Sequence, residues 1–374
     1  MPFATVEQAI QDLRTGKFIV VADDEDRENE GDLILAAEFI TAEKVNFLMQ
    51  AKGMICVALS AARVQQLELP LMGHENTDAL RTALGSTGIW AALDGIPTDE
   101  VLRFAAEVEA MGHSALWINE GSGREPFAVL GALARTTARI TLGLGIATTY
   151  ARDATAAHAG ARTVNDLCGG RFVMGLGVSH RSSANARGHD YATPLPTMRT
   201  YLDAYDAAPW TGPATVDPPL VIAALGPRML ALAATRSAGA FPYNVTEAMV
   251  RQARTTLDAA ADAAGNGSRP LLVASLPAVL GDPAEGIAGG RLLVSRYMGQ
   301  PNYRNNLLRA GFTEADLDGP SDALVTALVA LGDADELRAR IAGMHAAGAD
   351  HVTVIPLSPS GRQADLATAR AVAP

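Results

Sequence analysis

The chain has 374 residues, 48% of them hydrophobic, which is enough for the core of one or two domains. Its formal net charge of -11, without a long basic run, argues against a nucleic-acid partner. The sequence has no run of about 18 successive apolar residues and no signal-peptide pattern, which argues against a membrane protein. Two cysteines, Cys56 and Cys168, argue against a disulfide framework and favour a cytoplasmic location.

The first eighty residues predict a small alternating α/β unit. Val6, Ile10 and Leu13 fall on one face of a short helix. Short apolar runs predict strands on both sides of a strongly charged segment. In chain order, the expected elements are a helix at 6–13, a strand at 18–22, a strand at 33–37, a helix at 42–50 and a strand at 54–59.

The charged segment between these two strands is DDEDRENEGD, residues 23–32, in which eight of ten side chains are charged. Such a run is most often a solvated loop. Carboxylates crowded between two strands repel one another unless a cation or a proton relieves them. Mg²⁺ prefers one or two carboxylates with water and phosphate, and Arg27 can hold a phosphate by a forked contact.

This segment, with ICVALS, LELPLM and ENTDALRTA after it, resembles the N-terminal part of 3,4-dihydroxy-2-butanone-4-phosphate synthase, a riboflavin biosynthesis enzyme. The resemblance covers residues 1–83. It places Arg27, Glu28, Glu30 and Asp32 in the family's substrate and metal loop. Glu28 matches the position of the Mg²⁺ ligand.

The later part of that synthase has no counterpart in the sequence. The family's Gly-His-Thr motif, which supplies a metal histidine, and a downstream glutamate are both missing, and His74 does not lie in such a motif. The resemblance therefore implies an incomplete Mg²⁺ site. We expect a vestigial fragment without synthase activity.

From residue 84 onward, short apolar runs alternate with amphipathic segments about eight times. Strands buried on both faces and separated by helices are typical of parallel α/β folds. A (β/α)₈ TIM barrel needs roughly 250 residues, so it fits residues 84–374. The expected strands lie at 87–93, 115–118, 140–149, 171–180, 220–224, 239–243, 271–280 and 351–356. Three helices are expected between them: one with Thr98 as its N-cap, one that starts at Pro126 and one at 154–167.

In such a barrel the chemistry lies at the carboxyl ends of the strands. The second strand ends in Glu120, which is either a surface carboxylate paired with Arg124 or a proton donor or acceptor. The fourth ends in Ser179 and His180, and the histidine is either structural or catalytic. After the fifth, Gly226-Pro227 is either a simple turn into a helix or a close backbone approach to an anion or a flat ring.

The segments ALWINEGSGREPF, TLGLGIATTYARDA, GRFVMGLGVSH, RGHDY, PLPTMRTYLDAYDAA and AALGPRML resemble the luciferase-like oxidoreductases, most of all their coenzyme F420 branch. The resemblance implies a cofactor ring in the barrel mouth. Residues that would contact the cofactor are Ala147, Thr148, Ser179, Leu225, Gly226 and Pro227. Relatives that use the deazaflavin often carry histidine where this chain has Glu120.

Three functions follow as hypotheses. The first is an oxidoreductase that transfers a hydride between F420 and a small organic substrate, with Glu120 or His180 handling the proton. The second is an FMN-dependent monooxygenase on the same barrel. The third is a non-catalytic flavin-binding scaffold, in which the N-terminal fragment docks or forms a homodimer. The segments 181–193 and 283–320 are expected to be mouth loops that set the substrate.

Overall fold

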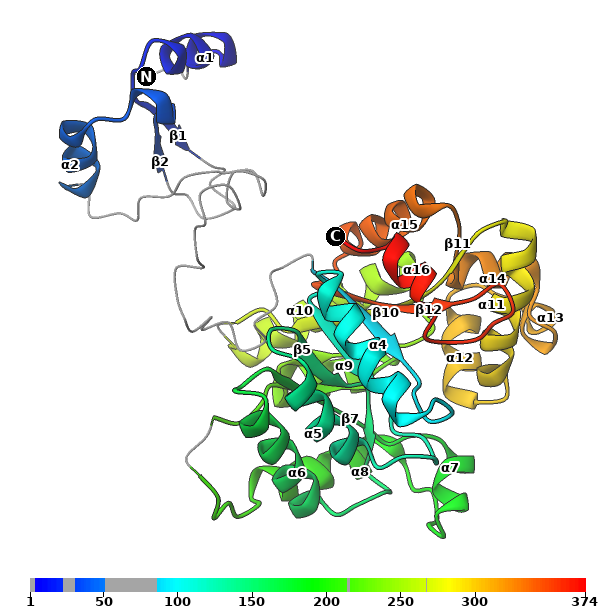
Figure 1. The fold of residues 1–374 in the computed structure, drawn as a ribbon. Coiled ribbons are helices and arrows are strands. Elements are labelled where there is room, and N and C mark those ends of the chain that lie inside the picture. The colour runs from blue at the N-terminus through cyan, green and yellow to red at the C-terminus, as the bar shows by residue number, and fades with distance from the viewer. Residues whose placement is uncertain (1–3, 23–30, 51–85, 214–215, 267) are drawn as a thin grey trace. The chain divides into compact units, whose positions relative to one another are not determined.

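The structure, a computed structural model, describes residues 4–22, 31–50, 86–213, 216–266 and 268–374 (Figure 1). The contacts of the chain divide it into two units, Met1–His74 and Glu75–Pro374. Several sequence predictions lie outside the described residues. They are the strand at 54–59, Cys56, His74 and the domain boundary between residues 83 and 84.

The N-terminal unit is built on an antiparallel two-stranded hairpin, in which Val21 lies opposite Asp32. The predicted helix at 42–50 is confirmed, whereas the second strand ends earlier than predicted because a short 3-10 helix follows it. A capping box formed by Thr5 and Gln8 starts the first helix. The elements are α1 Val6–Arg14, β1 Ile19–Ala22, β2 Gly31–Ile34, η1 Ala37–Phe39 and α2 Ala42–Gln50.

The second unit is a closed parallel barrel of eight strands, as the sequence predicted. The strand order is β3-β4-β5-β7-β8-β9-β10-β12, and β12 pairs with β3 to close it. Short strands β6 and β11 pair with β7 and β10. The strands are β3 Ser86–Ala91, β4 Ala115–Ile118, β5 Thr141–Leu144, β6 Ala147–Thr148, β7 Phe172–Gly177, β8 Leu220–Ile222, β9 Gly239–Ala240, β10 Leu271–Leu280, β11 Ala330–Gly332 and β12 His351–Leu357.

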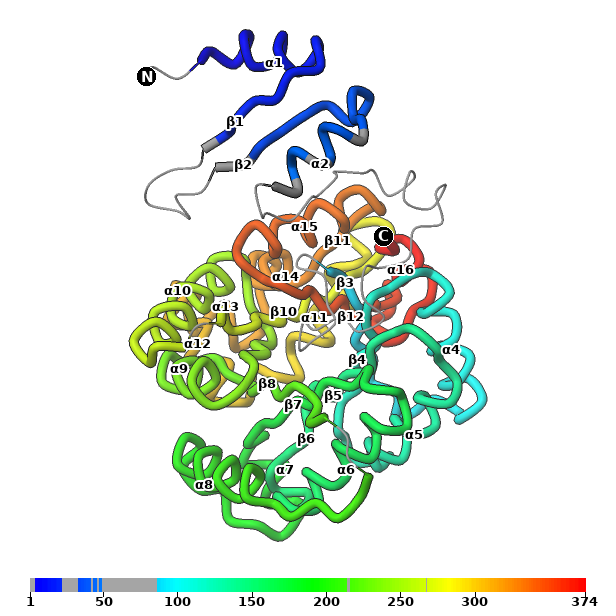
Figure 2. The backbone as a smooth tube through the Cα atoms, turned by 90° about the vertical axis from the view of Figure 1, so that its left-hand side faces the viewer, coloured from blue at the N-terminus to red at the C-terminus, as the bar shows by residue number. Residues whose placement is uncertain are grey.

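Helices surround the strands of the barrel (Figure 2). Their starts follow local capping rules: Glu125 accepts a hydrogen bond from the backbone N–H of Ala128, and Asp153 from that of Ala156. Within the described residues, no helix has both the length and the apolar character needed to cross a membrane. The helices are α4 Thr98–Ala110, α5 Pro126–Thr136, α6 Ala154–Leu167, α7 Arg181–Ala186, α8 Pro194–Asp206, α9 Pro227–Arg236, α10 Glu247–Ala264, α11 Pro283–Met298, α12 Pro301–Arg309, α13 Glu314–Asp318, α14 Asp322–Leu328, α15 Ala334–Ala346 and α16 Leu366–Ala371.

The predicted third strand at 140–149 is wrong as one element, because two strands lie there. Strand β5 pairs with β4, and the chain then turns through Gly145 and Ile146, which a cis peptide bond joins, before β6 pairs with β7. A side chain at Gly145 would collide with the Phe241 ring, since an added Cβ would lie 2.2 Å from it. The turn brings the backbone of residues 145–146 to the barrel mouth.

The expected loops at 181–193 and 283–320 are also wrong, because α7, α11, α12 and α13 lie in these segments. The glycines of α11 conceal its helical pattern in the sequence. They are buried contact points: an added Cβ at Gly289 would lie 2.4 Å from the Pro359 carbonyl oxygen. Close packing, which the sequence does not reveal, explains why glycine occupies a helix interior here.

Thr98 does not cap α4 as predicted. Pro97 is the N-cap residue, and no side chain caps the helix there. The Thr98 hydroxyl instead accepts a hydrogen bond of 3.1 Å from Arg124. The residue therefore links the start of α4 to the segment after β4.

His351, the first residue of β12, is a fully buried titratable group in the barrel interior. The Trp117 indole N–H donates to its Nε2 over 3.1 Å, so in the neutral ring Nδ1 carries the proton toward Ser86 Oγ, 2.8 Å away. Burial, with a smaller effect of the His345 charge, lowers the pKa of His351 to about 3. The ring therefore stays neutral in the folded protein at pH values where an unfolded chain binds a proton.

We expect the free energy of unfolding to fall as the pH decreases from 6.5 toward 3, because only the unfolded state protonates His351 in this window. One fully displaced proton costs about 1.4 kcal/mol for each pH unit. The substitution His351→Gln replaces the imidazole with an amide, which is polar but does not bind a proton in this pH range. Urea unfolding at several pH values is expected to show a smaller acid loss for this variant, and an equal loss would contradict the assignment.

Candidate cofactor and substrate site

A cavity of about 410 Å³ opens at the carboxyl ends of the barrel strands. Five of the residues predicted for the site line it, namely Glu120, Ser179, His180, Leu225 and Gly226. The other lining residues are Trp90, Asn119, Gly145, Ile146, Val178, Ser183, Tyr191, Pro194, Ala223, Ala224, Met229, Phe241, Tyr243, Tyr297, Asn302 and Tyr303. Strand ends far apart in the sequence thus meet at one cavity, as expected for a barrel.

Three predicted cofactor residues do not line this cavity. Ala147 and Thr148 are buried in β6, and the preceding residues Gly145 and Ile146 face the cavity instead. Pro227 is the first residue of α9 and borders a small neighbouring cavity of about 40 Å³. At this place in the barrel, the two residues before the predicted pair Ala147 and Thr148 line the cavity.

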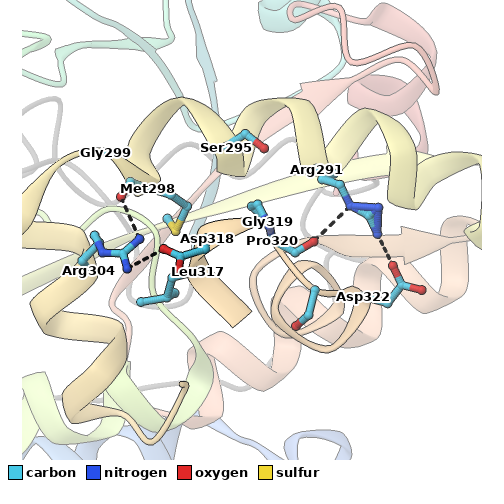
Figure 3. A pocket seen from close by; sticks show the side chains of 11 residues that line it. Arg291, Ser295, Met298, Gly299, Arg304, Leu317, Asp318, Gly319, Pro320 and Asp322 are labelled. Carbon is cyan, nitrogen blue, oxygen red and sulfur yellow. Dashed lines mark hydrogen bonds and ion pairs between the residues drawn. The ribbon is translucent and has the colours of Figure 1, made fainter. Parts of the chain in front are cut away.

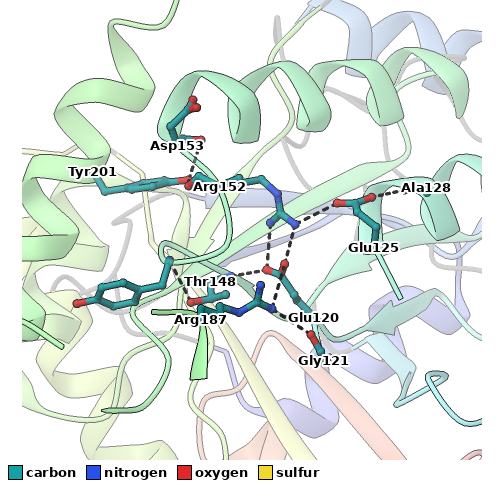
Figure 4. Close-up of polar contacts among 10 residues, drawn as sticks. Glu120, Gly121, Glu125, Ala128, Thr148, Arg152, Asp153, Arg187 and Tyr201 are labelled. Carbon is teal, nitrogen blue, oxygen red and sulfur yellow. Dashed lines mark hydrogen bonds and ion pairs between the residues drawn. The ribbon is translucent and has the colours of Figure 1, made fainter. Parts of the chain in front are cut away.

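Glu120 is buried at the edge of the cavity, with its side chain only 3% exposed (Figure 4). Arg152 holds both carboxylate oxygens, with distances of 3.0 Å from Nη1 to Oε2 and 2.6 Å from Nη2 to Oε1. The backbone N–H of Thr148 donates to Oε2 over 2.7 Å. The carboxylate therefore joins the end of β4 to β6 and to the segment before α6.

Of the two alternatives for Glu120, the surface pair with Arg124 is wrong. Arg124 donates to Thr98 and to the Ile96 carbonyl, whereas Arg152, 32 positions away, binds Glu120. Burial alone would lower the pKa of Arg152, but its hydrogen bond with Glu120 and the nearby negative charges outweigh that effect and raise it. The Arg152 guanidinium is thus kept charged in a place where its side chain is only 14% exposed.

His180 lies at the N-terminal end of α7, and its ring centroid is 5.5 Å from that of Tyr303. Burial lowers the pKa of His180, and a hydrogen bond with the Asn302 side chain opposes this only in part. The imidazole is therefore neutral near pH 7. Ser179 before it has a φ of 55°, a strained value for a residue other than glycine that is common at ligand sites.

Five aromatic side chains form one wall of the cavity, and the sequence interpretation missed all of them. Trp90, Phe241 and Tyr243 follow or belong to barrel strands, whereas Tyr297 and Tyr303 come from α11 and α12. The three tyrosine rings contact one another at centroid distances of 5.0 to 6.1 Å, and the Trp90 ring lies 5.8 Å from that of Tyr243. The Phe241 ring instead contacts that of Trp117. Only the tertiary fold brings them together, so local spacing gave no signal.

A polar hollow of about 680 Å³ adjoins the cavity and shares Glu120, Ser179 and Ser183 with it. Arg187 lines this hollow and donates to the Gly121 carbonyl over 3.1 Å. Hydroxyl groups of Ser122, Ser179, Ser182 and Ser183 also line it. Arginine and hydroxyl groups together suit a phosphate or carboxylate.

Another hollow, of about 700 Å³, lies between α11 and the segment around α13 and α14 (Figure 3). Its two arginines already have partners: Arg291 binds Asp322, and Arg304 binds Glu314 and Asp318. It also lies away from the residues at the strand ends. It is larger than the 410 Å³ cavity, yet its paired charges leave little to recognise a ligand.

The acidic segment of the N-terminal unit lies mostly outside the described residues. Arg27, Glu28 and Glu30 are among those not described, and Asp32 lies in β2. Within the part of the chain that is described, no group of three His, Cys, Asp or Glu side chains is placed to hold a metal.

Family models match both parts of the chain. The model of luciferase-like monooxygenases matches residues 79–351, and that of 3,4-dihydroxy-2-butanone 4-phosphate synthase matches residues 7–96. The chain therefore joins a synthase-like N-terminal region to a luciferase-like barrel, as the sequence interpretation stated.

Curated relatives match the N-terminal region. The 3,4-dihydroxy-2-butanone 4-phosphate synthase of Campylobacter jejuni is 53% identical over 88 residues, which are 23% of this chain and 26% of that protein. The riboflavin biosynthesis protein RibBA of Phocaeicola vulgatus is 54% identical over 79 residues, 21% of this chain and 20% of that protein. The chain thus spans about a quarter or less of these two relatives.

Solved structures match the barrel. The F420-dependent tetrahydromethanopterin reductase from Methanopyrus kandleri has a TM-score of 0.65 at 19% identity, covering 77% of this chain and 97% of that one. An F420-dependent secondary alcohol dehydrogenase with an F420-acetone adduct has a TM-score of 0.60 at 14% identity, covering 77% and 96%. The oxygenating constituent of 3,6-diketocamphane monooxygenase from Pseudomonas putida, in complex with FMN, has a TM-score of 0.59 at 15% identity. The match covers 78% of this chain and 97% of that one. At these identities the likeness concerns the fold alone.

Proposed function

The chain belongs to the luciferase-like monooxygenase family, and from this membership we propose that its barrel binds coenzyme F420 and transfers a hydride between this cofactor and a small organic substrate. The observation that carries the proposal is the cavity of about 410 Å³ at the strand ends, with its polar neighbour. A barrel of this kind commonly binds its ligands at that end.

The residues of the cavity fit a flat ring with a charged tail. Gly145, Ile146, Ala223 and Leu225 give a small, largely apolar surface for the ring. In the adjoining hollow, Arg187 and the serine hydroxyls would hold a phosphate or carboxylate. When bound, the deazaflavin would supply the hydride chemistry, and the chain would supply orientation and a dry site.

His180 is the residue that we assign to the proton. It lines the cavity, and its lowered pKa keeps it neutral near pH 7, where it can accept a proton from a substrate hydroxyl. Glu120 is less suited to this task, because Arg152 and the Thr148 N–H already occupy both of its oxygens. We assign Glu120 to positioning β6 at the cavity.

An FMN-dependent monooxygenase is the second candidate. It is supported by the family description and by the FMN complex among the structures of similar fold. The same cavity and hollow fit the FMN ring and its phosphate. Oxygen uptake separates the two candidates, because a deazaflavin does not readily react with oxygen.

A non-catalytic scaffold is the third candidate, and it rests on the N-terminal unit, which spans only part of its relatives. In this reading the unit serves for docking or for a homodimer. A small-molecule substrate, the homodimer and a cytoplasmic location all remain proposals. Removing residues 1–83 tests the docking role: unchanged oligomeric state and activity would exclude it.

We propose that the N-terminal region does not make dihydroxybutanone phosphate. It matches only part of the synthase, 26% of the Campylobacter jejuni enzyme and 57% of the Agrobacterium fabrum enzyme, and the later metal histidine of that family has no match in the sequence. The purified chain with Mg²⁺ is expected to leave ribulose 5-phosphate unchanged. Release of dihydroxybutanone phosphate above a protein-free control would contradict this.

The proposed cofactor is tested by titrating the purified chain with F420 and, separately, with FMN, and following the fluorescence of each ligand. Micromolar binding of F420 alone supports the hydride-transfer proposal. Micromolar binding of FMN alone favours the monooxygenase. Binding of neither favours the scaffold.

A further inference from the structure

The cavity at the strand ends carries no unpaired charge among its described lining residues. Glu120 is the one carboxylate in the lining, and Arg152 neutralises it from outside the cavity. His180 is neutral near pH 7. A charged group entering this cavity would lose water without gaining an opposite charge, which disfavours its binding.

The aromatic wall forms a continuous series across the cavity. Ring centroids lie 5.8 Å apart from Trp90 to Tyr243, 5.0 Å from Tyr243 to Tyr297, 5.2 Å from Tyr297 to Tyr303 and 5.5 Å from Tyr303 to His180. The two tyrosines of α11 and α12 lie outside the barrel strands. Aromatic faces of this kind favour flat rings over saturated ones of equal size.

One polar atom at the lining residues lacks a hydrogen-bond partner among the described residues. It is the Oδ1 atom of Asn119, whereas the Tyr243 hydroxyl has the Tyr297 side chain as its partner. Buried polar atoms usually have partners, because an unmet hydrogen bond is costly. One acceptor therefore remains to be satisfied at this cavity.

We propose that the substrate of this site is an uncharged molecule with a flat aromatic or conjugated ring and a hydroxyl or carbonyl group, and that Tyr297 and Tyr303 determine this preference. This inference rests on the proposed function, because it names the substrate class of the same cavity. The ring packs against the aromatic wall, and an uncharged donor such as a hydroxyl can meet the unpaired Oδ1 atom of Asn119.

The test uses five small probes of similar size with the full chain. Acetophenone and 1-phenylethanol are neutral, benzoate is an anion and benzylammonium is a cation. Dissociation constants are measured by calorimetry in the presence of saturating F420 or FMN, whichever binds. The neutral probes are expected to bind at least about tenfold more tightly than both ions, since burying an unpaired charge is costly. Cyclohexyl methyl ketone, which has no flat ring, is expected to bind more weakly than acetophenone.

Two substitutions, each with a control substitution, localise the effect. Met229→Arg adds a cation to the lining and is expected to shift the preference toward benzoate, whereas Met229→Leu keeps the preference. Tyr297→Leu is expected to weaken acetophenone binding severalfold. Tyr205→Leu, a buried tyrosine on α8 that does not line the cavity, is the matched control and is expected to leave the binding unchanged.

The outcomes separate the two proposals. Equal or tighter binding of either ion to the wild-type chain, or no binding of the neutral probes, would overturn the substrate class even if a cofactor binds. If neither cofactor binds, the proposed function fails, and the same probes on the chain alone still test the substrate preference. If a variant does not fold, the dissociation constants of the neutral and charged probes with the wild-type chain still test the proposed substrate class.

Discussion

Replacing Glu120 by alanine is expected to lower the free energy of unfolding by about 3 kcal/mol, because it leaves the Arg152 guanidinium without its main partner in a place where that side chain is only 14% exposed. The backbone N–H of Thr148 loses its acceptor in the same step. The start of α6 and the β6 strand are both expected to loosen. Urea unfolding at neutral pH measures the change.

The substitution Glu120→Gln is the matched comparison. It keeps one acceptor for Thr148 but removes the charge that pairs with Arg152, so an intermediate loss is expected. Asp99→Ala serves as a control, because Asp99 makes only an exposed contact of 3.9 Å with Arg103 and its loss is expected to cost less than about 1 kcal/mol. Equal losses for Glu120→Ala and Asp99→Ala would contradict the role of Glu120 in the fold.

Replacing His180 by glutamine is expected to reduce turnover by roughly 10²- to 10⁴-fold, the usual contribution of a positioned acid or base. Folding is expected to be little changed, because the amide keeps a polar group near Asn302. The rate is measured as reduction of the cofactor by the first substrate that supports turnover. His189→Gln, an exposed histidine outside the cavity lining, is the control and is expected to retain full activity.

The pH dependence gives an independent check on His180. As a base it must be neutral, so the rate of substrate oxidation is expected to fall as the pH drops through a pKa below 6.5. The glutamine variant is expected to lose this acidic limb. A profile that stays the same in wild type and variant would assign the proton to another group.

Local sequence patterns were sufficient where a helix or strand depends on its own residues. The strand at 115–118, the helix at 154–167 and the strand at 271–280 have the predicted bounds. Capping side chains and strands buried on both faces are visible in the sequence itself. The fold class followed from their alternation.

Patterns failed where distant contacts decide the structure. The segment 283–320 was expected to be a loop, yet the glycines of α11 within it are buried where the helix packs closely on its neighbours. Glu120 suggested Arg124 as a partner because of its spacing, but the barrel brings Arg152 to it. For the same reason, the tyrosines of α11 and α12 could not be assigned to the cavity from the sequence.

The most direct test of the cofactor site combines a ligand titration with a blocking substitution. Ala223 lines the cavity, so Ala223→Trp is expected to fill the space for the ring, whereas Ala204→Trp, on the exposed side of α8, does not reach the cavity. Fluorescence titration with F420 is expected to give micromolar binding for wild type and Ala204→Trp, and at least about tenfold weaker binding for Ala223→Trp. Equal affinity of all three proteins for F420, or no binding of F420 to the wild type, would contradict a deazaflavin site at the mouth of this barrel.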